Sequence, residues 1–449
     1  MEFFVLNKKW ITRLMASGKG EGLRAQLLRG GIGVGGLKML SLPLTFLSAV
    51  LLARGLGPEG YGQYAFVIAL LSILSIPLGP ALMQLTTRET ARMHQAGEKG
   101  RICAFLHWAT RHVWIGSVMI SAVLGFIAFC LADWRADDRW TLLLLSLPIM
   151  PFIGFNALRC GILAGLRRVV LGQLPELFIR PIVLLFVLGS LLLIGFLNPL
   201  TAVATFVAAV ILAFAVGAVL LRRIFPESKN AVVPIDTAQS MLWTRSWGPF
   251  TLMVAASTLN AQIGILLLGW LSSNDQVAAM QVAEQGARMV SLSLAVVNLI
   301  IAPHITQTHR SGNRTRLQEL CRHSARLVFL VALPIALPLI FFGSPILRFL
   351  FGAEYVQIAT LPLAILAIGQ LLNAAFGSVG LFLTMSGFEC DTLRGQFIAL
   401  FLNVCAALFL IPILGAVGAA LATCVGLLVW NIILALLVAK RLKIRPGFI

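Results

Sequence analysis

The chain has few acidic residues and no polar stretch long enough to fold by itself. Its 449 residues include 17 Asp and Glu against 35 Lys and Arg. The longest polar connections between its apolar runs are 84–112, 222–247 and 303–325, each of about 20 to 30 residues. Independent domains usually need about 50 residues or more. The sequence therefore excludes a separate catalytic domain, and we expect no enzyme.

Residues that could bind metals or nucleotides form no recognisable motif. The seven Cys are scattered and the six His form no ligand pair, so neither a disulfide framework nor a metal site is indicated. The segment 17–20 lacks the GK[ST] ending of a phosphate-binding loop. Gly31, Gly33, Gly35 and Gly36 follow no expected strand and suit close helix packing instead. An ATP-driven pump loses support, and we expect no cofactor.

Long apolar runs dominate the sequence. Apolar residues make up 59% of the chain and charged residues 12%, and the mean hydropathy is +0.93. A membrane-spanning helix needs roughly 20 apolar residues. Twelve segments approach or exceed that length: 31–54, 61–83, 113–132, 140–163, 175–197, 200–221, 248–271, 277–302, 326–348, 356–386, 396–412 and 413–439. Because the bilayer core cannot satisfy free backbone groups, we expect an all-α polytopic membrane protein with about twelve transmembrane helices.

The basic residues alternate between the gaps that separate these segments. Thirty of the 35 Lys and Arg lie in or beside every second gap, or in the two tails. The other gaps hold four, and Arg288 lies inside a segment. Short loops rich in Lys and Arg stay in the cytoplasm. We therefore expect a bacterial inner-membrane protein with both termini cytoplasmic, and we attribute the net charge of +18 to topology and not to nucleic-acid binding.

The twelve segments divide into two six-helix bundles of the same orientation. Residues 31–221 form the first bundle and residues 248–439 the second, with a cytoplasmic linker at 222–247. Residues 1–30 alternate apolar and basic side chains, which predicts an amphipathic helix on the inner leaflet, and residues 440–449 form a basic cytoplasmic tail. This organisation predicts two parallel repeats that rock around a site in the middle of the membrane.

Charged residues inside the apolar segments mark the candidate binding site, because such residues are costly in a membrane. Glu284 and Arg288 lie near the middle of the eighth segment, one turn apart on one helical face. Gln281 and Gln285 extend this polar stripe. Two explanations remain open, a structural ion pair that locks two helices or a cavity cation held by its own carboxylate. We favour the second, because Arg suits forked recognition of phosphate oxygens.

Six further polar residues are candidates for the same substrate-binding site. They are Glu176, Arg180, Arg159, Lys38, Asn260 and Gln262. Glu176 and Arg180 repeat the Glu-to-Arg spacing, and the shallower cations either line a cavity or extend to the membrane surface. Each deep carboxylate has an Arg one turn away, so no unpaired acidic group is left to bind a cation. Basic residues are in surplus around the expected site, which predicts an anionic ligand.

Several stretches of the chain together resemble one family of transporters. They are ARGLGPEGYGQY at 53–64, GQLPELFIRP at 172–181, FGAEY at 351–355, MSG at 385–387, Asn403, and IPILGAVGAALAT at 411–423. From about residue 30 to 440 the chain resembles the polysaccharide-transport branch of the MOP flippase superfamily, the Wzx-type exporters of lipid-linked oligosaccharides. The resemblance implies a ligand of undecaprenyl diphosphate that carries a sugar repeat unit of the O-antigen or exopolysaccharide type. It also implies membrane lipids and the polysaccharide polymerase machinery as partners.

One departure from the family pattern bears on ion coupling. Members often carry an acidic residue in the seventh span before an apolar LLLG run, whereas Asn260 and Gln262 precede the run at 266–269 here. A coupling role for that acid therefore does not carry over. Three alternatives remain open: a MATE-type multidrug or metabolite exporter, a non-transporting scaffold for polysaccharide assembly, and a lipid II flippase, which normally has more spans.

Overall fold

The computed structural model describes residues 23–130, 138–224 and 237–447. Within these ranges the chain consists of helices joined by turns, which confirms the all-α expectation. The expected amphipathic helix at 1–30 lies largely outside the described residues. So do part of the linker at 222–247 and the last two residues of the tail.

The helices before the linker are α2 (Leu23–Leu74), α3 (Pro80–Gln95), α4 (Lys99–Cys130), α6 (Asp138–Ser146), η1 (Leu147–Ile149), α7 (Met150–Gly165), α8 (Val169–Leu174), η2 (Pro175–Ile179), α9 (Arg180–Ile194) and α10 (Pro199–Ile224). Of these, η1 is a 3-10 helix and η2 a π-helix. After the linker come α11 (Thr237–Leu271), α12 (Asn274–Arg310), α13 (Arg314–Phe341), α14 (Gly343–Leu350), α15 (Glu354–Phe376), α16 (Val379–Met385), α17 (Glu389–Leu414) and α18 (Ala416–Leu442).

The expected number of membrane spans agrees with these helices. Ten helical stretches of the described chain are long and apolar enough to cross a membrane, and α12, which bends by 43° near residue 299, makes an eleventh. One of the ten, Gly33–Leu74, contains a break at Gly57, whose φ of 66° and ψ of 178° are not helical. Glycine adopts such a positive φ readily. The chain reverses there, so α2 consists of two arms, which together with α12 gives the twelve spans.

Tight turns collect at one end of the molecule, which we call the hairpin end. They lie at Gly57, at 195–198 between α9 and α10, at Ser272 and Ser273, and at Gly415. The short connections between the segments that end at 197 and begin at 200, and between those that meet at 412 and 413, are thus tight hairpins. The opposite end, which we call the loop end, carries the turns near residues 97, 167, 312 and 387.

Two expected spans are broken where the sequence predicted continuous helices. The segment 61–83 is interrupted by a turn between Leu74 and Pro80. Pro77 and Pro80 carry no backbone N–H and cannot continue the helical ladder, so α2 ends and α3 begins with Pro80 in its first turn. The segment 356–386 is divided in the same way at Gly377, whose φ is 71°.

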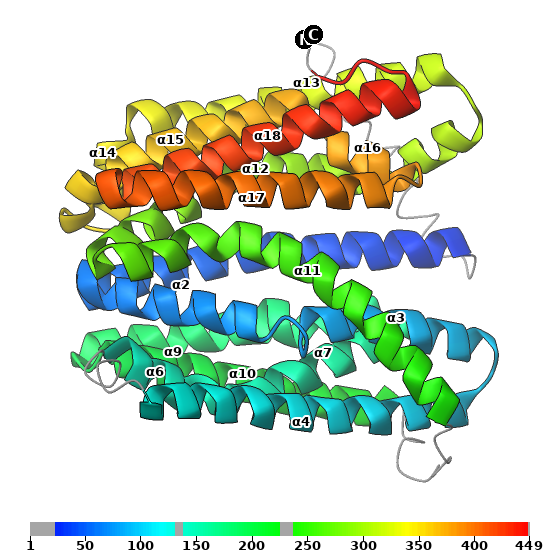
Figure 1. The fold of residues 1–449 in the computed structure, drawn as a ribbon, viewed down its shortest axis with the longest axis horizontal. Coiled ribbons are helices and arrows are strands. Elements are labelled where there is room, and N and C mark those ends of the chain that lie inside the picture. The colour runs from blue at the N-terminus through cyan, green and yellow to red at the C-terminus, as the bar shows by residue number, and fades with distance from the viewer. Residues whose placement is uncertain (1–22, 131–137, 225–236, 448–449) are drawn as a thin grey trace.

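The two halves lie side by side and meet along their middle layer. In Figure 1, α13, α15, α17 and α18 lie in the upper half, and α4, α7, α9 and α10 lie in the lower half. α2 and α12 pack together between them, and α11 crosses diagonally from α3 to α17. The beginning of α11, which the sequence assigned to the linker at 222–247, therefore packs on the first half.

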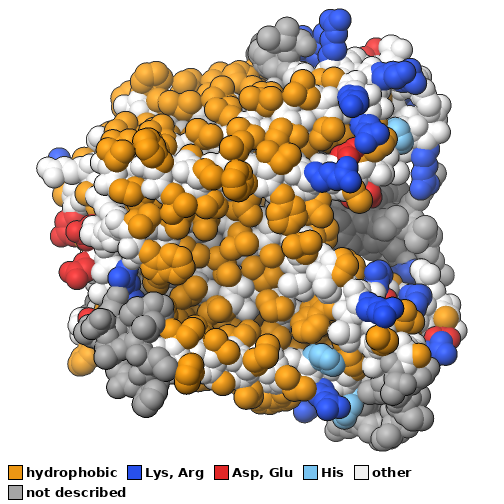
Figure 2. Space-filling model, viewed as in Figure 1, with side chains coloured by type: hydrophobic (Ala, Val, Ile, Leu, Met, Phe, Trp, Pro, Cys, Tyr) orange, Lys and Arg blue, Asp and Glu red, His pale blue; other side chains and the backbone are white. Residues whose placement is uncertain are grey.

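The surface of the molecule suits a membrane. Figure 2 shows hydrophobic side chains over the face between the two ends, with Lys and Arg gathered at the loop end. Inside, the largest buried cluster includes Tyr61 and Ala53 from the first half and Met280, Tyr355 and Ala419 from the second. The apolar core is thus continuous across the interface between the halves. The protein is a multi-pass membrane protein.

Candidate substrate-binding site

The first charged pair of the candidate site lies on α12. The Arg288 guanidinium donates to the Glu284 carboxylate at 3.0 Å, as the i,i+4 spacing predicted. The Glu284 side chain is 14% exposed and that of Arg288 is 50% exposed. Because α12 is surrounded by α2, α11, α13, α15, α16 and α18, we interpret the exposed side of Arg288 as facing the space between the halves.

The second charged pair belongs to the first half. Arg180 pairs with Glu176 at 2.7 Å, with their side chains 33% and 25% exposed. The pair lies where the π-helix η2 passes into α9, between Pro175 and Pro181. π-turns often occur at functional sites. The Arg180 guanidinium also lies 5.9 Å from the centre of the Phe206 ring on α10.

Two tyrosines on the second arm of α2 lie between these charged pairs. The rings of Tyr61 and Tyr64 stack with their centres 6.4 Å apart and their planes 13° apart. Tyr61 interacts with the Gln281 side chain and lies within electrostatic reach of Glu284 and Arg288. Tyr64 lies within electrostatic reach of Arg180. The structure therefore brings the two Glu–Arg pairs, one from each half, to the same pair of aromatic rings.

Sequence reasoning did not select the tyrosines as site residues, although a signal was present. The chain contains only three Tyr. Two of them close the stretch 53–64, and the third is Tyr355. All three are buried in the cluster that joins the halves. Their scarcity and their presence within two of the family-like stretches could have identified them.

Three side chains make four hydrogen bonds across the interface at the hairpin end, and each bond ends on a backbone carbonyl. The Arg54 guanidinium donates to the carbonyl oxygens of Leu350, at 2.8 Å, and of Phe349. The Tyr355 hydroxyl donates to the Ala53 carbonyl oxygen at 2.9 Å, and the Arg139 guanidinium donates to that of Gly269. These carbonyls lie in the last turns of α14, the first arm of α2 and α11, where helices lack internal donors.

The backbones of the two halves also approach each other closely at the hairpin end. A Cβ atom added at Gly62 on α2 would lie 1.9 Å from the carbonyl oxygen of Asn274, which begins α12. A Cβ atom at Gly269 would lie 2.1 Å from the Phe66 ring. Only glycine permits these contacts, so the hairpin end is closed by backbone packing as well as by hydrogen bonds.

At the loop end the halves are joined through aromatic residues of α11. The Trp247 indole N–H donates to the Pro77 carbonyl oxygen, inside the break between α2 and α3, at 2.9 Å. Trp243 packs edge-to-face on Phe105 of α4 at 5.1 Å between ring centres.

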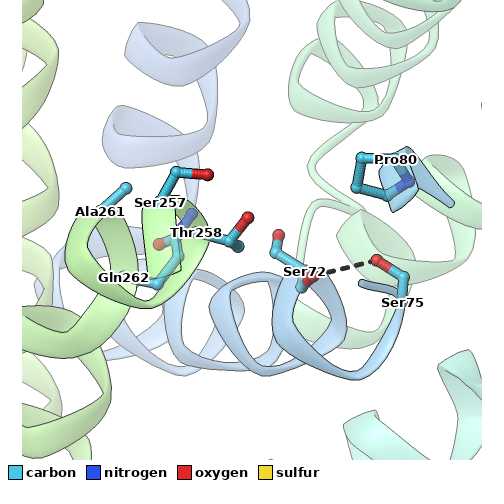
Figure 3. Close-up of a pocket in the computed structure, with 7 residues that line it drawn as sticks. All are labelled: Ser72, Ser75, Pro80, Ser257, Thr258, Ala261 and Gln262. Atoms are coloured by element: carbon cyan, nitrogen blue, oxygen red, sulfur yellow. Dashed lines mark hydrogen bonds between the residues drawn. The ribbon is translucent and has the colours of Figure 1, made fainter. Parts of the chain in front are cut away.

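A pocket of 440 Å³ lies between the two halves, on the loop-end side of the tyrosines. It is lined by Ser72, Ser75, Pro80, Ser257, Thr258, Ala261 and Gln262. Figure 3 shows α11 on one side of this pocket and the end of α2 with the first residue of α3 on the other. Gln262, expected in the site, belongs to this pocket and not to the charged pairs.

The other three candidate residues make no ion pair with these groups. Arg159 is 2% exposed, lies within electrostatic reach of Glu176, and donates to the Gly172 carbonyl at 3.0 Å and to Asn156 at 3.2 Å, inside the first half. Asn260 accepts from Asn403 on α17 at 3.3 Å, inside the second half. Lys38 is exposed on the first arm of α2. In the described ranges no cluster of three or more His, Cys, Asp or Glu residues is placed to hold a metal ion.

Comparison with known families identifies the chain. The profile of the polysaccharide biosynthesis protein family matches residues 27–309, more than half of the sequence. The chain belongs to this family. The resemblance to the polysaccharide-transport branch of the MOP superfamily is thereby confirmed. The MatE profile matches residues 249–411, inside the second half. No curated protein matches the chain.

Solved structures of MOP transporters share the fold. A multidrug resistance MATE family transporter of the MOP superfamily in an inward-facing conformation has a TM-score of 0.73 at 16% identity, over 90% of this chain and 94% of its own. The lipid II flippase MurJ in an inward closed conformation has a TM-score of 0.71 at 14% identity, over 90% and 86%. The MATE transporter VcmN of Vibrio cholerae has a TM-score of 0.59 at 18% identity, over 96% and 98%. At these identities the likeness establishes the fold.

Proposed function

We propose that this protein is a flippase that moves undecaprenyl-diphosphate-linked oligosaccharide repeat units from the cytoplasmic to the outer leaflet of a bacterial inner membrane. Its family membership supports the substrate class, and the MurJ-like fold is that of a protein described as a lipid II flippase. Lipids of the membrane surround it, and the polymerase machinery that consumes the repeat units is its functional partner.

The proposal depends chiefly on one observation: two Glu–Arg ion pairs, one from each half, lie near the interface between the halves. A diphosphate cannot cross bare hydrocarbon, because desolvating its charges costs far too much. Arg288 and Arg180 offer planar donors that fit phosphate oxygens. While the site is empty, Glu284 and Glu176 keep these cations neutralised. A diphosphate that displaces the carboxylates gains two guanidinium partners, one from each half.

The two ends of the molecule differ in charge and in the contacts between the halves, and this difference supports an alternating-access mechanism. The basic residues gather at the loop end, which by the positive-inside rule faces the cytoplasm. The hairpin end is closed by hydrogen bonds and glycine contacts. Substrate therefore enters from the cytoplasm when the halves separate at the loop end. Rocking of the halves opens the hairpin end and releases the headgroup outside.

The membrane potential favours this direction of transport. Each elementary charge that crosses the membrane is worth about 2.3 kcal/mol per 100 mV. Two net negative charges moving outward therefore gain about 4–5 kcal/mol at that potential. The gain is smaller if the cavity cations move with the substrate. In that case the potential drives the empty positive site back inward, so a coupling ion is not required.

The test is outward translocation of a fluorescent undecaprenyl diphosphate oligosaccharide in liposomes that contain the purified protein. Arg288→Ala should reduce the rate at least tenfold, because a charge-assisted contact is worth about 1.5–3 kcal/mol, and Arg288→Lys should retain part of the activity. Arg322→Ala, an exposed residue at the loop end, is the matched control. Wild-type transport by the Arg288→Ala variant would refute the role of this site. Export of cationic drugs without lipid translocation would favour the MATE-type alternative.

A further inference from the structure

The pocket in Figure 3 is lined by uncharged hydrogen-bonding side chains, unlike the ionic site. Hydroxyls of Ser72, Ser75, Ser257 and Thr258 and the amide of Gln262 surround its 440 Å³. That volume falls in the range of about 300–1,000 Å³ that is usual for small-molecule sites. Hydroxyl and amide groups both donate and accept hydrogen bonds. They therefore match a ligand rich in hydroxyls better than they match an anion.

Two of the lining side chains have no partner within the protein. Ser72, Ser75 and Ser257 donate to carbonyl oxygens of their own helices, those of Ile68, Ser72 and Val254. In the described part of the chain, Thr258 and Gln262 make no side-chain hydrogen bond, although both lie well inside the span of α11. Polar groups at such depth are costly unless they are satisfied. Water can satisfy these groups in the empty protein, and a ligand can replace it.

The pocket lies on the same face of α2 as the tyrosines of the ionic site. On the second arm of α2, Ser72 follows Tyr61 by 11 residues, which is three helical turns and about 16 Å along one face. The pocket therefore lies about 16 Å from Tyr61 along α2, on its loop-end side.

Both halves contribute to the pocket. Ser72 lies in the last turn of α2 and Ser75 directly follows this helix, both in the first half, and Thr258 and Gln262 lie on α11. The break between Leu74 and Pro80 forms its edge, and discontinuous helices frequently form substrate sites in transporters. A ligand that contacts both helices is released when the halves separate, as alternating access requires.

We infer that this pocket binds the sugar residues of the substrate and contributes to selection among repeat units. The inference rests on the proposed function. The diphosphate contacts Arg288 and Arg180, and the sugars extend about 16 Å toward the loop end along the face of α2. The two sites differ in the part of the substrate that they recognise. Charged residues recognise the diphosphate common to all such lipids, and Thr258 and Gln262 recognise hydroxyls whose positions differ from one sugar to another.

The test compares two probes in liposomes: undecaprenyl diphosphate that carries one hexose, and the same lipid with a linear tetrasaccharide. The double variant Thr258→Val with Gln262→Leu keeps side-chain volume and removes two hydrogen-bonding groups. Each lost bond is worth about 0.5–1.5 kcal/mol. Transport of the tetrasaccharide lipid should fall about tenfold, and that of the hexose lipid should change less than twofold. Thr258→Ser retains the hydroxyl and should transport both probes.

Matched controls separate a loss of sugar binding from a loss of folding. Thr244→Val on the same helix and Gln357→Leu at the hairpin end replace exposed residues and should leave both rates unchanged. An equal fall for both probes, or no change for either, would overturn the inference. If Arg288→Ala slows both probes while the double variant leaves their ratio unchanged, the proposed function stands and the sugar pocket does not. A wild-type protein that moves neither probe would remove the basis of both.

Discussion

At the hairpin end the two halves are joined by three hydrogen-bonding side chains that come from both halves, whereas at the loop end they are joined by one indole donor and by ring packing, both from α11. Arg54, Arg139 and Tyr355 supply the donors at the first end, and they come from both halves. Trp247 and Trp243 supply the contacts at the second end. The first set is polar and reaches across the interface. The second set belongs to α11 alone, whose beginning packs on the first half.

This difference bears on how the interface opens. Carbonyls in the last turn of a helix lack an intrahelical donor, and water can satisfy them when they become exposed. The bonds made by Arg54 and Tyr355 can therefore break toward solvent at modest cost, as a reversible gate requires. The Pro77 carbonyl that accepts from Trp247 lies in the broken segment between α2 and α3. Because α11 belongs to the second half and Pro77 to the first, we expect this bond to break when the loop end opens.

The largest expected effect on closure of the hairpin end comes from replacing the glycine at its closest backbone contact, Gly62. In Gly62→Ala the new Cβ would lie 1.9 Å from the Asn274 carbonyl oxygen, and neither backbone can yield without the helices parting. Overpacking of this kind costs about 3 kcal/mol. The population closed at the hairpin end should fall about a hundredfold, and transport should fall with it. Spin labels at Glu59 and Gln357 would report the change as a longer distance between the two halves.

A control for this variant exists on the same helix. A Cβ atom at Gly36 would meet no heavy atom within 4 Å, so Gly36→Ala should leave both the label distance and the transport rate unchanged. If Gly62→Ala behaves like Gly36→Ala, the hairpin end is not closed by backbone contact.

A smaller shift in the same direction is expected when Arg54 is replaced by Ala. The guanidinium donates to two carbonyls of α14, and bonds from a charged donor are worth about 1.5–3 kcal/mol. Because Arg54 is exposed, we expect the lower end of this range, or about a tenfold loss of the closed population. The same pair of spin labels would measure it. Arg348→Ala, a basic residue of α14 with exposed surface, is the control, and an equal effect there would point to general charge and not to the bonds.

The spans and the tight turns could be predicted because they depend on local sequence. Apolar runs of sufficient length fix the helices, and Gly415 and Pro199 mark two of the hairpins. The i,i+4 spacing predicted both ion pairs, and both are formed. The break between Leu74 and Pro80 was missed, because the apolar run continues through it. The two prolines were the better signal there.

The contacts across the interface could not be predicted from a single sequence. Arg54 and Leu350 are 296 positions apart, and their bond depends on how two helix ends meet. The same limit applies to the cations inside the spans. Arg159 and Arg288 look alike in sequence, yet Arg159 is enclosed by its own half and Arg288 is half exposed. Only the packing of the neighbouring helices decides which of the two can meet a ligand.

The smallest expected effect comes from Trp247→Phe, which should open the loop end instead of the hairpin end. This change keeps an aromatic ring but removes the indole N–H that donates to Pro77. A neutral hydrogen bond is worth about 1 kcal/mol. The loop end should open about fivefold more often, which lengthens the distance between spin labels at Gln95 and Arg322. The labels at Glu59 and Gln357 should remain at the closed distance or move closer to it. If Trp247→Phe instead opened the hairpin end, as Arg54→Ala does, the two ends would not act as opposing gates, and the alternation proposed from their different chemistry would be wrong.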